Sequence, residues 1–296
     1  MHRPLVSIGM PVYNGEAFLQ RTLDSLLAQN YENIEFHISD NASTDGTQDI
    51  CRSYLTKDRR VHYYRSSKNI GQLPNWQRAL ELASGDYFMW AACDDSWSAN
   101  YVETLVQCLL ACPNAALAAG KTLFMDENGR LLSRGAADAP PSYPNSPVVR
   151  AKQLLAQHAV GWLHGVYRKR ALLTQLPTLL EKNPWGSDLL FLLEMCLRYE
   201  ATGSDKAIMF KRLAQTNTSH GSVPRTPRQV VAWQCWFAWE LTRSIVSSDL
   251  RLAEKRQLLA TCSRYLRRLY FWEGTLVWTK VWIRAGCHRF IGVDRT

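Results

Sequence analysis

YFMWAACDDSW, residues 87–97, is the stretch from which the fold is best predicted. It begins with apolar residues that do not alternate with polar ones, and it reaches two adjacent carboxylates, Asp94 and Asp95. A short uninterrupted apolar run is typical of a strand buried on both faces, as in the centre of a parallel sheet. Because an unpaired carboxylate is costly to bury, we expect both acids at the carboxyl end of this strand, where open α/β sheets bind ligands.

Adjacent carboxylates at such an edge suit a hard divalent cation, Mg²⁺ or Mn²⁺, whose remaining ligands include substrate phosphates. The same residues also fit a solvated turn in which Asp94 or Asp95 caps the helix expected from about Ser98. A pair of acids is a weak motif by itself. The choice between a metal site and a helix cap therefore depends on the rest of the chain.

The preceding and following segments alternate between strand and helix patterns. Apolar runs predict strands, and segments with one apolar face predict helices; the strands are 5–10, 34–39, 61–65 and 115–119, and the helices 16–29, 48–55, 75–83 and 99–111. This order predicts a Rossmann-like, mostly parallel sheet flanked by helices. The sequence lacks the GxGxxG and GxxxxGK[ST] loops, which argues against dinucleotide-binding and NTPase domains.

Two segments in this order resemble the amino-terminal half of family 2 glycosyltransferases: VSIGMPVYNGEAFLQRTLDSLLAQNYENIEFHISDNASTDGT, residues 6–47, and NIGQLPNWQRALELASGDYFMWAACDD, residues 69–95. The resemblance covers about residues 5–125. It implies the GT-A nucleotide-diphospho-sugar transferase fold and an inverting enzyme. We expect this α/β domain to be followed by a C-terminal helical extension.

The resemblance also implies which residues bind the donor. The first loop would cradle the nucleotide base, Asp40 would hydrogen-bond the base, and Asp95 would bind Mn²⁺ or Mg²⁺. The predicted nucleotide-binding residues are Pro11, Tyr13, Asn14, Glu16, Asp40, Asn69, Gly71, Asn75 and Asp94. Each of them could instead serve only a turn or a helix cap. The family often has acids flanking one residue, whereas here Cys93 precedes an adjacent pair.

The second half of the sequence is less regular. Residues 126–129 predict a hairpin turn, 136–147 a surface loop and 160–167 a strand. Asp188, in PWGSDLLFLL, resembles the family's catalytic base, although helix capping by Ser187 and Asp188 explains the same residues. The other acids considered for the base are Glu181, Glu194 and Asp205. His220 follows a predicted strand and is a second candidate metal ligand, with a solvated loop histidine as the alternative.

The C-terminal region differs in charge from the rest of the chain. Net charge is +9, and residues 206–296 hold 16 Lys and Arg against 5 Asp and Glu. Three helical stretches, near 226–247, 251–270 and 272–290, interleave these basic residues with six Trp. Basic amphipathic helices with Trp suit an anionic membrane surface, although the same face could pack on the catalytic domain. No nucleic-acid motif is present, so we expect no nucleic-acid partner.

The eight cysteines have no metal-binding or disulfide spacing, and the sequence shows neither a signal peptide nor a membrane-spanning run. We therefore expect a cytoplasmic protein, in part peripheral on the inner face of the cytoplasmic membrane. We predict two domains. Residues 1–222 form the catalytic domain, with a nucleotide-binding half up to about 125 and an acceptor half from about 126. Residues 223–296 form a helical C-terminal region.

The predicted function is transfer of a sugar from a nucleoside-diphosphate donor, most simply a UDP-sugar. The acceptor would be a glycan or a lipid-linked saccharide in the synthesis of a bacterial surface polysaccharide such as O-antigen. One alternative is a non-catalytic scaffold that binds a nucleotide-sugar. A sugar nucleotidyltransferase is disfavoured, because 11–16 contains no basic residue.

Overall fold

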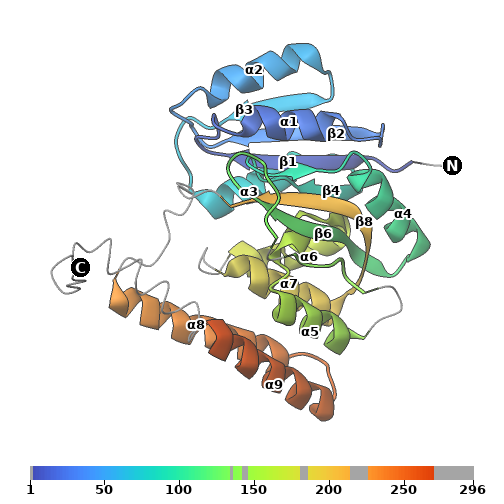
Figure 1. Ribbon diagram of the computed structural model, residues 1–296, viewed down its shortest axis with the longest axis vertical. Helices are drawn as coiled ribbons and strands as arrows, with labels where there is room; N and C mark the ends of the chain where they lie inside the picture. Colours follow the sequence, from blue (N-terminus) through green and yellow to red (C-terminus); the bar gives the residue numbers. More distant parts are fainter. Residues whose placement is uncertain (1–2, 134–135, 142–145, 181–185, 214–225, 270–296) are drawn as a thin grey trace, which may run out of the picture. The chain divides into compact units, whose positions relative to one another are not determined.

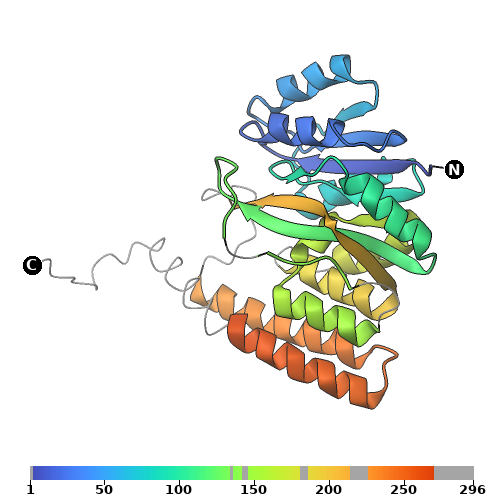
Figure 2. The ribbon, with the colours of Figure 1, turned by 45° about the vertical axis from the view of Figure 1, so that its right-hand side comes forward.

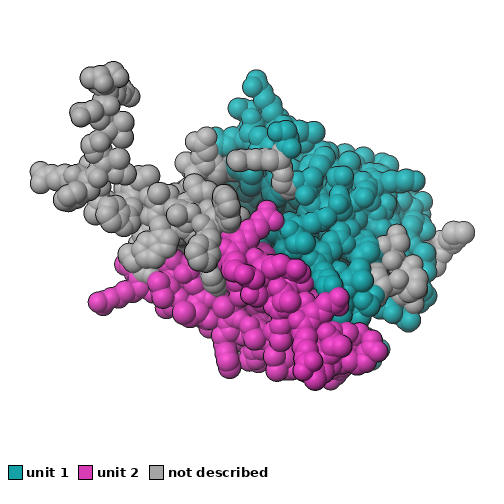
Figure 3. All heavy atoms as spheres, turned by 60° about the horizontal axis from the view of Figure 1, so that its bottom comes forward, with its two compact units in different colours: residues 1–220 teal, residues 221–296 magenta. Residues whose placement is uncertain are grey.

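The computed structural model describes residues 3–133, 136–141, 146–180, 186–213 and 226–269. The chain divides into two compact units, residues 1–220 and 221–296 (Figure 3). The first unit is built around one eight-stranded sheet with strand order β3-β2-β1-β4-β7-β6-β8-β5 (Figure 1). In chain order the strands are β1 Val6–Val12, β2 Ile34–Asp40, β3 Val61–Arg65, β4 Tyr87–Trp90, β5 Ser96–Trp97, β6 Ala115–Met125, β7 Val166–Arg168 and β8 Glu200–Arg212.

The first four strands form the predicted parallel sheet. β1 lies between β2 and β4 and is parallel to both, and β2 is parallel to β3. Every residue of β1 and β4 is buried, as uninterrupted apolar strands predict. Val12 pairs with Asp40 at the end of the ladder, so the loops after β1 and β2 leave the sheet at the same edge.

Helices cover both faces of this half of the sheet. The helices are α1 Leu19–Leu27, α2 Thr47–Lys57, α3 Gln72–Glu81 and α4 Tyr101–Ala111. Apolar side chains of α1, α2 and α4 form one core with the face of the sheet that includes Ile8, Phe36 and Met89. α3 packs on the opposite face, against β1 and β2. The α/β fold predicted for this region is therefore confirmed.

The second half of the sheet is mixed rather than parallel. β7 is antiparallel to both β4 and β6, whereas β6 and β8 are parallel and run side by side (Figure 2). The strand predicted at 160–167 is wrong for most of its length, because Val160–His164 is a 3₁₀ helix, η1, and only β7 is extended. Gly165 explains the sharp change, since a Cβ there would collide with the carbonyl oxygen of Ala118 on β6.

The predicted turn at 126–129 is present. The carboxylate of Asp126 accepts hydrogen bonds from the backbone N–H groups of Asn128, 2.9 Å, and Arg130, 2.8 Å, and Gly129 has φ of +85°. The predicted surface loop is partly wrong, because Ala137 pairs with Thr122 of β6 and is buried. Three further helices complete the unit: α5 Pro147–Gln157, α6 Lys169–Leu180 and α7 Ser187–Arg198.

The second unit contains α8 Pro227–Val246 and α9 Leu252–Arg268. These helices pack on each other and bury Leu241, Ile245, Leu258 and Cys262. α8 begins with a capping box in which Thr226 and Gln229 exchange side-chain and backbone hydrogen bonds. The helix predicted near 272–290 lies outside the described residues. Among the helices that are described, none combines the length and apolarity needed to cross a bilayer.

Candidate active site

The loops after β1 and β2 are joined to each other by hydrogen bonds. Asn14, with φ of +52°, accepts a hydrogen bond on Oδ1 from the N–H of Thr44, 2.8 Å, and donates its own N–H to the hydroxyl of Ser43, 2.9 Å. The carboxylate of Glu16 accepts from the N–H of Gly46, 3.0 Å. The side chains of Asn14 and Glu16 therefore hold two loops together.

Two predicted residues of the first loop have different surroundings. Pro11 is buried within β1, where it shapes the end of the strand. Tyr13 is 41% exposed, so much of its ring is open to solvent beside the joined loops. An aromatic ring in this position offers an apolar face on which a planar base can stack.

Asp40 ends β2, as predicted, and its carboxylate is fully buried. Its Oδ1 accepts hydrogen bonds from the backbone N–H, 2.9 Å, and the hydroxyl, 2.6 Å, of Ser43. Its Oδ2 accepts from the hydroxyl of Tyr63, 2.6 Å, and forms an ion pair with Arg65 Nε at 3.2 Å. Burial and the Asp40 carboxylate raise the pKa of Tyr63, which keeps this hydroxyl protonated as a donor. The predicted hydrogen bond that Asp40 would accept from a base stays a prediction, and it would compete with these contacts.

The Asn69, Gly71 and Asn75 segment is attached to the same loops through Asn41. The Asn41 amide donates to Asn69 Oδ1, 2.9 Å, and to the Gly71 carbonyl oxygen, 3.1 Å. Asn75 is buried, and its amide exchanges hydrogen bonds with the hydroxyl, 2.7 Å, and carbonyl oxygen, 2.9 Å, of Ser39. The structure thus brings the three segments together, with Asn75 as a support beneath the site.

Asn41 was not among the residues that the sequence predicted for the site. It accepts the N–H of Ile70 at 2.8 Å in addition to its two donor contacts, and so it joins the loop after β2 to the loop after β3. Its position beside Asp40 was the available signal.

The acidic pair lies in the loop between β4 and β5. Asp94 is half-buried, whereas Asp95 is 2% exposed. The hydroxyl of Thr22 on α1 lies 3.0 Å from the Cys93 carbonyl oxygen and 2.8 Å from that of Asp95. Oδ1 of Asp95 accepts the backbone N–H of Arg212 at 2.7 Å. Within the described part of the chain, the Asp94 carboxylate and Oδ2 of Asp95 accept no hydrogen bond.

The electrostatic surroundings of Asp95 are balanced between opposing effects. Burial and the neighbouring Asp94 charge raise the pKa of Asp95, and Lys211 lowers it, so that it lies at about 6. A carboxyl group with this pKa is ionised at neutral pH but unfavourably solvated. A cation at the open oxygen atoms would relieve that cost.

The donor set fits a divalent cation of the Mn²⁺ or Mg²⁺ type. Such ions take oxygen ligands and are often held by one or two carboxylates plus substrate phosphates and water. Asp94 and the open oxygen of Asp95 supply that minimum. No cluster of three or more His, Cys, Asp or Glu suited to a metal occurs among the described residues. His220, the other predicted ligand, lies outside the described residues.

Asp188, the candidate base, occupies the first turn of α7 and is partly exposed. Its Oδ1 accepts the N–H of Leu189 at 2.8 Å. Phe191, three residues later on the same side of the helix, packs against Trp90, with ring centroids 6.2 Å apart. Because Trp90 ends β4, this contact places the start of α7 near the carboxyl edge of the sheet.

The alternative bases are less well placed. Glu194 lies two turns along α7 and is buried, and Asp205 accepts the N–H of Ala139 at 2.9 Å. Glu181 lies outside the described residues.

His164 is buried with Nδ1 3.0 Å from the Trp90 carbonyl oxygen, and burial and Lys211 lower its pKa to about 3. The imidazole is therefore neutral at physiological pH. Its hydrogen is on Nδ1, which donates a hydrogen bond to the Trp90 carbonyl oxygen.

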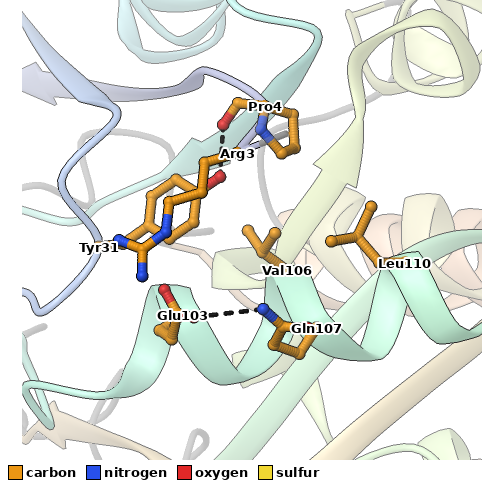
Figure 4. Close-up of a pocket in the computed structure, with 7 residues that line it drawn as sticks. All are labelled: Arg3, Pro4, Tyr31, Glu103, Val106, Gln107 and Leu110. Carbon is orange, nitrogen blue, oxygen red and sulfur yellow. Dashed lines mark hydrogen bonds between the residues drawn. The ribbon is translucent and has the colours of Figure 1, made fainter. Parts of the chain in front are cut away.

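A pocket of about 400 Å³ lies elsewhere on the first unit (Figure 4). It is lined by Arg3, Pro4, Tyr31, Glu103, Val106, Gln107 and Leu110. Arg3 and Pro4 precede β1, so the pocket is at the amino end of that strand. It contains none of the predicted site residues.

Comparison with known proteins identifies the family. A family profile described as "Glycosyl transferase family 2" matches residues 7–169, which is more than half of the chain. The chain belongs to glycosyl transferase family 2. Apart from Val6, this match includes both segments that suggested the resemblance, and it extends beyond them to β7.

Curated relatives share the first part of the chain. The putative teichuronic acid biosynthesis glycosyltransferase TuaG of Bacillus subtilis is 34% identical over 108 residues, 36% of this chain and 43% of that protein. An uncharacterized glycosyltransferase of Haemophilus influenzae is 34% identical over 129 residues, 44% of this chain and 51% of that protein. The chain thus spans about half the length of these relatives.

Solved structures show the fold beyond that region. S. aureus TarS 1–349 in complex with UDP-GlcNAc aligns with a TM-score of 0.69 and 20% identity, over 90% of this chain and 73% of that one. The mannosyltransferase PcManGT from Pyrobaculum calidifontis, in complex with GDP-Man and Mn²⁺, aligns with a TM-score of 0.54 and 16% identity, over 96% of this chain and 81% of that one. The predicted GT-A fold is confirmed.

Proposed function

We propose that this chain is an inverting, metal-dependent glycosyltransferase of surface polysaccharide synthesis. It moves a sugar from a nucleoside-diphosphate donor, a UDP-sugar in the first instance, to a hydroxyl group of a glycan or lipid-linked acceptor. The observation that carries the proposal is the acidic pair, two adjacent carboxylates with open oxygen atoms beside the joined loops. Family membership and the fold shared with TarS bound to UDP-GlcNAc support the donor class, and TuaG supports the product class.

In this proposal the residues of the first half hold the donor. The exposed ring of Tyr13 stacks on the base, and the loop that Asp40 braces frames it. Asp94 and Asp95 face the diphosphate and hold Mn²⁺ or Mg²⁺. When bound, the cation supplies Lewis acidity that stabilises the negative charge on the departing diphosphate.

Asp188 accepts the proton of the acceptor hydroxyl as that oxygen attacks the anomeric carbon. Such general-base help contributes about 10²–10⁴-fold to the rate. Inversion requires attack from the face opposite the leaving diphosphate, so Asp188 and the acidic pair lie on opposite sides of the sugar. The start of α7, near the end of β4, is compatible with that arrangement.

The second unit supplies a membrane contact for a lipid-linked acceptor. Residues 226–269 carry 8 Lys and Arg against 3 Asp and Glu, and Trp239 on α8 is 65% exposed. Basic charge and an exposed Trp favour the interface of an anionic bilayer. Sedimentation with phosphatidylglycerol vesicles tests this contact, and the Trp239→Ala variant is expected to bind them more weakly.

The test of the donor site is a thermal-shift screen of nucleotides and nucleotide-sugars with and without Mn²⁺. A ligand that binds only the folded state raises the unfolding midpoint by mass action. We expect a metal-dependent shift with one family of diphosphates and loss of that shift in Asp95→Ala. Absence of any shift in folded wild-type protein would contradict the proposal. Release of the nucleoside diphosphate during turnover then separates an enzyme from a binding protein.

A further inference from the structure

Arg212, the last residue of β8, is a buried cation beside the acidic pair that the sequence reasoning missed. It is 5% exposed. A buried guanidinium must find hydrogen-bond acceptors, because it stays charged and is costly to desolvate. Its partners therefore indicate what the residue holds in place.

The guanidinium of Arg212 joins three segments of the chain. Nε donates to the Asp94 carbonyl oxygen at 2.9 Å, and Nη1 donates to the carbonyl oxygens of Asp126, 2.9 Å, and Glu127, 2.8 Å. Its Cζ lies 4.6 Å from the ring centroid of Phe18, where α1 begins. The acidic loop, the turn after β6 and the entry to α1 are thus tied to one side chain.

These contacts fix the backbone of the acidic pair and leave its ligand atoms open. Arg212 uses its backbone N–H for Oδ1 of Asp95 and its side chain for the Asp94 carbonyl oxygen, not for the Asp94 carboxylate. A planar fork with several fixed donors orients its acceptors more strictly than a lysine ammonium does. A residue in this role orients the carboxylates that would bind the cation, and it does not compete with the cation for their oxygen atoms.

We propose that Arg212 is a positioning residue, which orients Asp94 and Asp95 for a cation bound together with a nucleoside diphosphate. The inference rests on the proposed donor site and deepens it. We call the contacts of the Arg212 guanidinium the Arg212 clamp. Its removal is expected to weaken metal-dependent nucleotide binding, because residues that hydrogen-bond to metal ligands typically contribute about 10–100-fold to metal affinity.

Arg168 provides a matched control within the same sheet. Its guanidinium donates to the carbonyl oxygens of Ala115, 2.9 Å, and Leu109, 2.7 Å, and its Cζ lies 5.4 Å from the ring centroid of Tyr87. Like Arg212 it has carbonyl acceptors and an aromatic ring, and its Nη1 also donates to the Tyr87 hydroxyl at 2.8 Å. Tyr87 begins β4, however, so Arg168 lies at the end of that strand remote from the acidic pair.

The experiment is calorimetric titration of the full chain with UDP, in Mn²⁺ and in EDTA, for wild type, Arg212→Lys and Arg168→Lys. The quantity compared is the ratio of the Kd in EDTA to the Kd in Mn²⁺. We expect Arg212→Lys to lower this ratio by about tenfold or more and Arg168→Lys to leave it unchanged. Both variants are expected to lower the unfolding midpoint, so stability alone does not separate them.

An unchanged ratio in folded Arg212→Lys, or an equal fall in both variants, would overturn the positioning role. If Arg212→Lys does not fold, Phe18→Leu is used instead, because it removes the ring beneath the guanidinium. A ratio of the two Kd values equal to that of wild type in Phe18→Leu would then overturn the positioning role. Wild-type protein that binds UDP with no dependence on Mn²⁺ would overturn the proposed donor site itself. The two failures are therefore distinguishable.

Discussion

Asp40 and the Asp94–Asp95 pair follow neighbouring parts of one sheet, yet their carboxylates have opposite surroundings. Both oxygens of Asp40 accept hydrogen bonds from Ser43 and Tyr63, and Arg65 adds an ion pair. In the acidic pair only Oδ1 of Asp95 has a hydrogen-bond donor among the described residues. A carboxylate whose acceptor sites are all filled by the protein braces the fold, whereas one with open oxygen atoms is available to a ligand. The contrast supports the proposal that the first region braces the fold and the second binds the ligand.

Asp188 extends this comparison to the second half of the chain, and its removal carries the largest expected effect. We expect Asp188→Asn to lower kcat by about 10²–10⁴-fold because the general base is lost, with little change in the Kd for the donor nucleotide. Measuring turnover and UDP binding on the same preparation checks both. Unchanged turnover would move the base to another residue.

Asp95→Asn separates chemistry from stability. We expect kcat/KM to fall by about 10²–10³-fold, the usual cost of losing one electrostatic stabiliser of a developing charge, because Asp95 would hold the cation that stabilises the departing diphosphate. The unfolding midpoint at pH 7 should stay level or rise, because burial raises the pKa of Asp95 to about 6 and makes its ionised form unfavourable in the free protein. Scanning calorimetry with the turnover assay tests this pair of outcomes, and a large loss of stability would contradict it.

Asp40→Asn should give the reverse pattern. An amide in place of the carboxylate leaves a buried donor of Ser43 or Tyr63 poorly satisfied, which costs about 1–3 kcal/mol of unfolding free energy. The affinity of the folded variant for UDP should change only a few-fold. Chemical denaturation measures the first quantity and calorimetric titration the second. A loss of UDP affinity near 100-fold in folded protein would show that Asp40 contacts the base directly.

Glu35, at the start of β2, is a third carboxylate, and it carries the smallest expected effect. Burial alone would raise its pKa, but hydrogen bonds from Ser7 and Ser84 outweigh that and lower it to about 2. Because the folded-state pKa is depressed, the stabilisation is complete above the unfolded value of about 4.5 and is lost as pH falls toward 2.

The unfolding midpoint of Glu35→Gln should therefore lie below that of wild type at pH 7, and the gap should narrow below pH 4.5. Thermal unfolding across this range measures the gap. A constant gap would contradict the assigned network. The Kd for the nucleotide should be unchanged in Glu35→Gln, whereas substitutions in the acidic pair should raise it.

The sequence predicted the first half well because strand burial and helix amphipathicity are local patterns. The strands expected at 5–10 and 34–39 are present as Val6–Val12 and Ile34–Asp40, so the first runs two residues further than predicted, and the loop carrying Asp94 follows the strand at Tyr87–Trp90. The resemblance then supplied the roles that spacing alone left open.

The second half was harder to predict because its structure depends on contacts between distant segments. The 3₁₀ turn before β7 depends on the close approach of Gly165 to β6, and the clamp at Arg212 depends on carbonyl groups from residues 94, 126 and 127. Neither has a periodic signal. Asn14 and Glu16 were placed in the correct loop from the sequence, but the hydrogen bonds that their side chains accept appear only in the fold.

The most direct test of the central claim is an electron paramagnetic resonance titration of Mn²⁺ in the presence of UDP. Wild type, Asp94→Asn, Asp95→Asn and Asp40→Asn would be compared as folded proteins at neutral pH. We expect one protein-bound Mn²⁺ per chain in wild type and in Asp40→Asn, and loss of that ion in Asp94→Asn and Asp95→Asn. Retention of Mn²⁺ in Asp94→Asn and Asp95→Asn, or its loss in Asp40→Asn, would contradict the division between bracing and ligand-binding carboxylates.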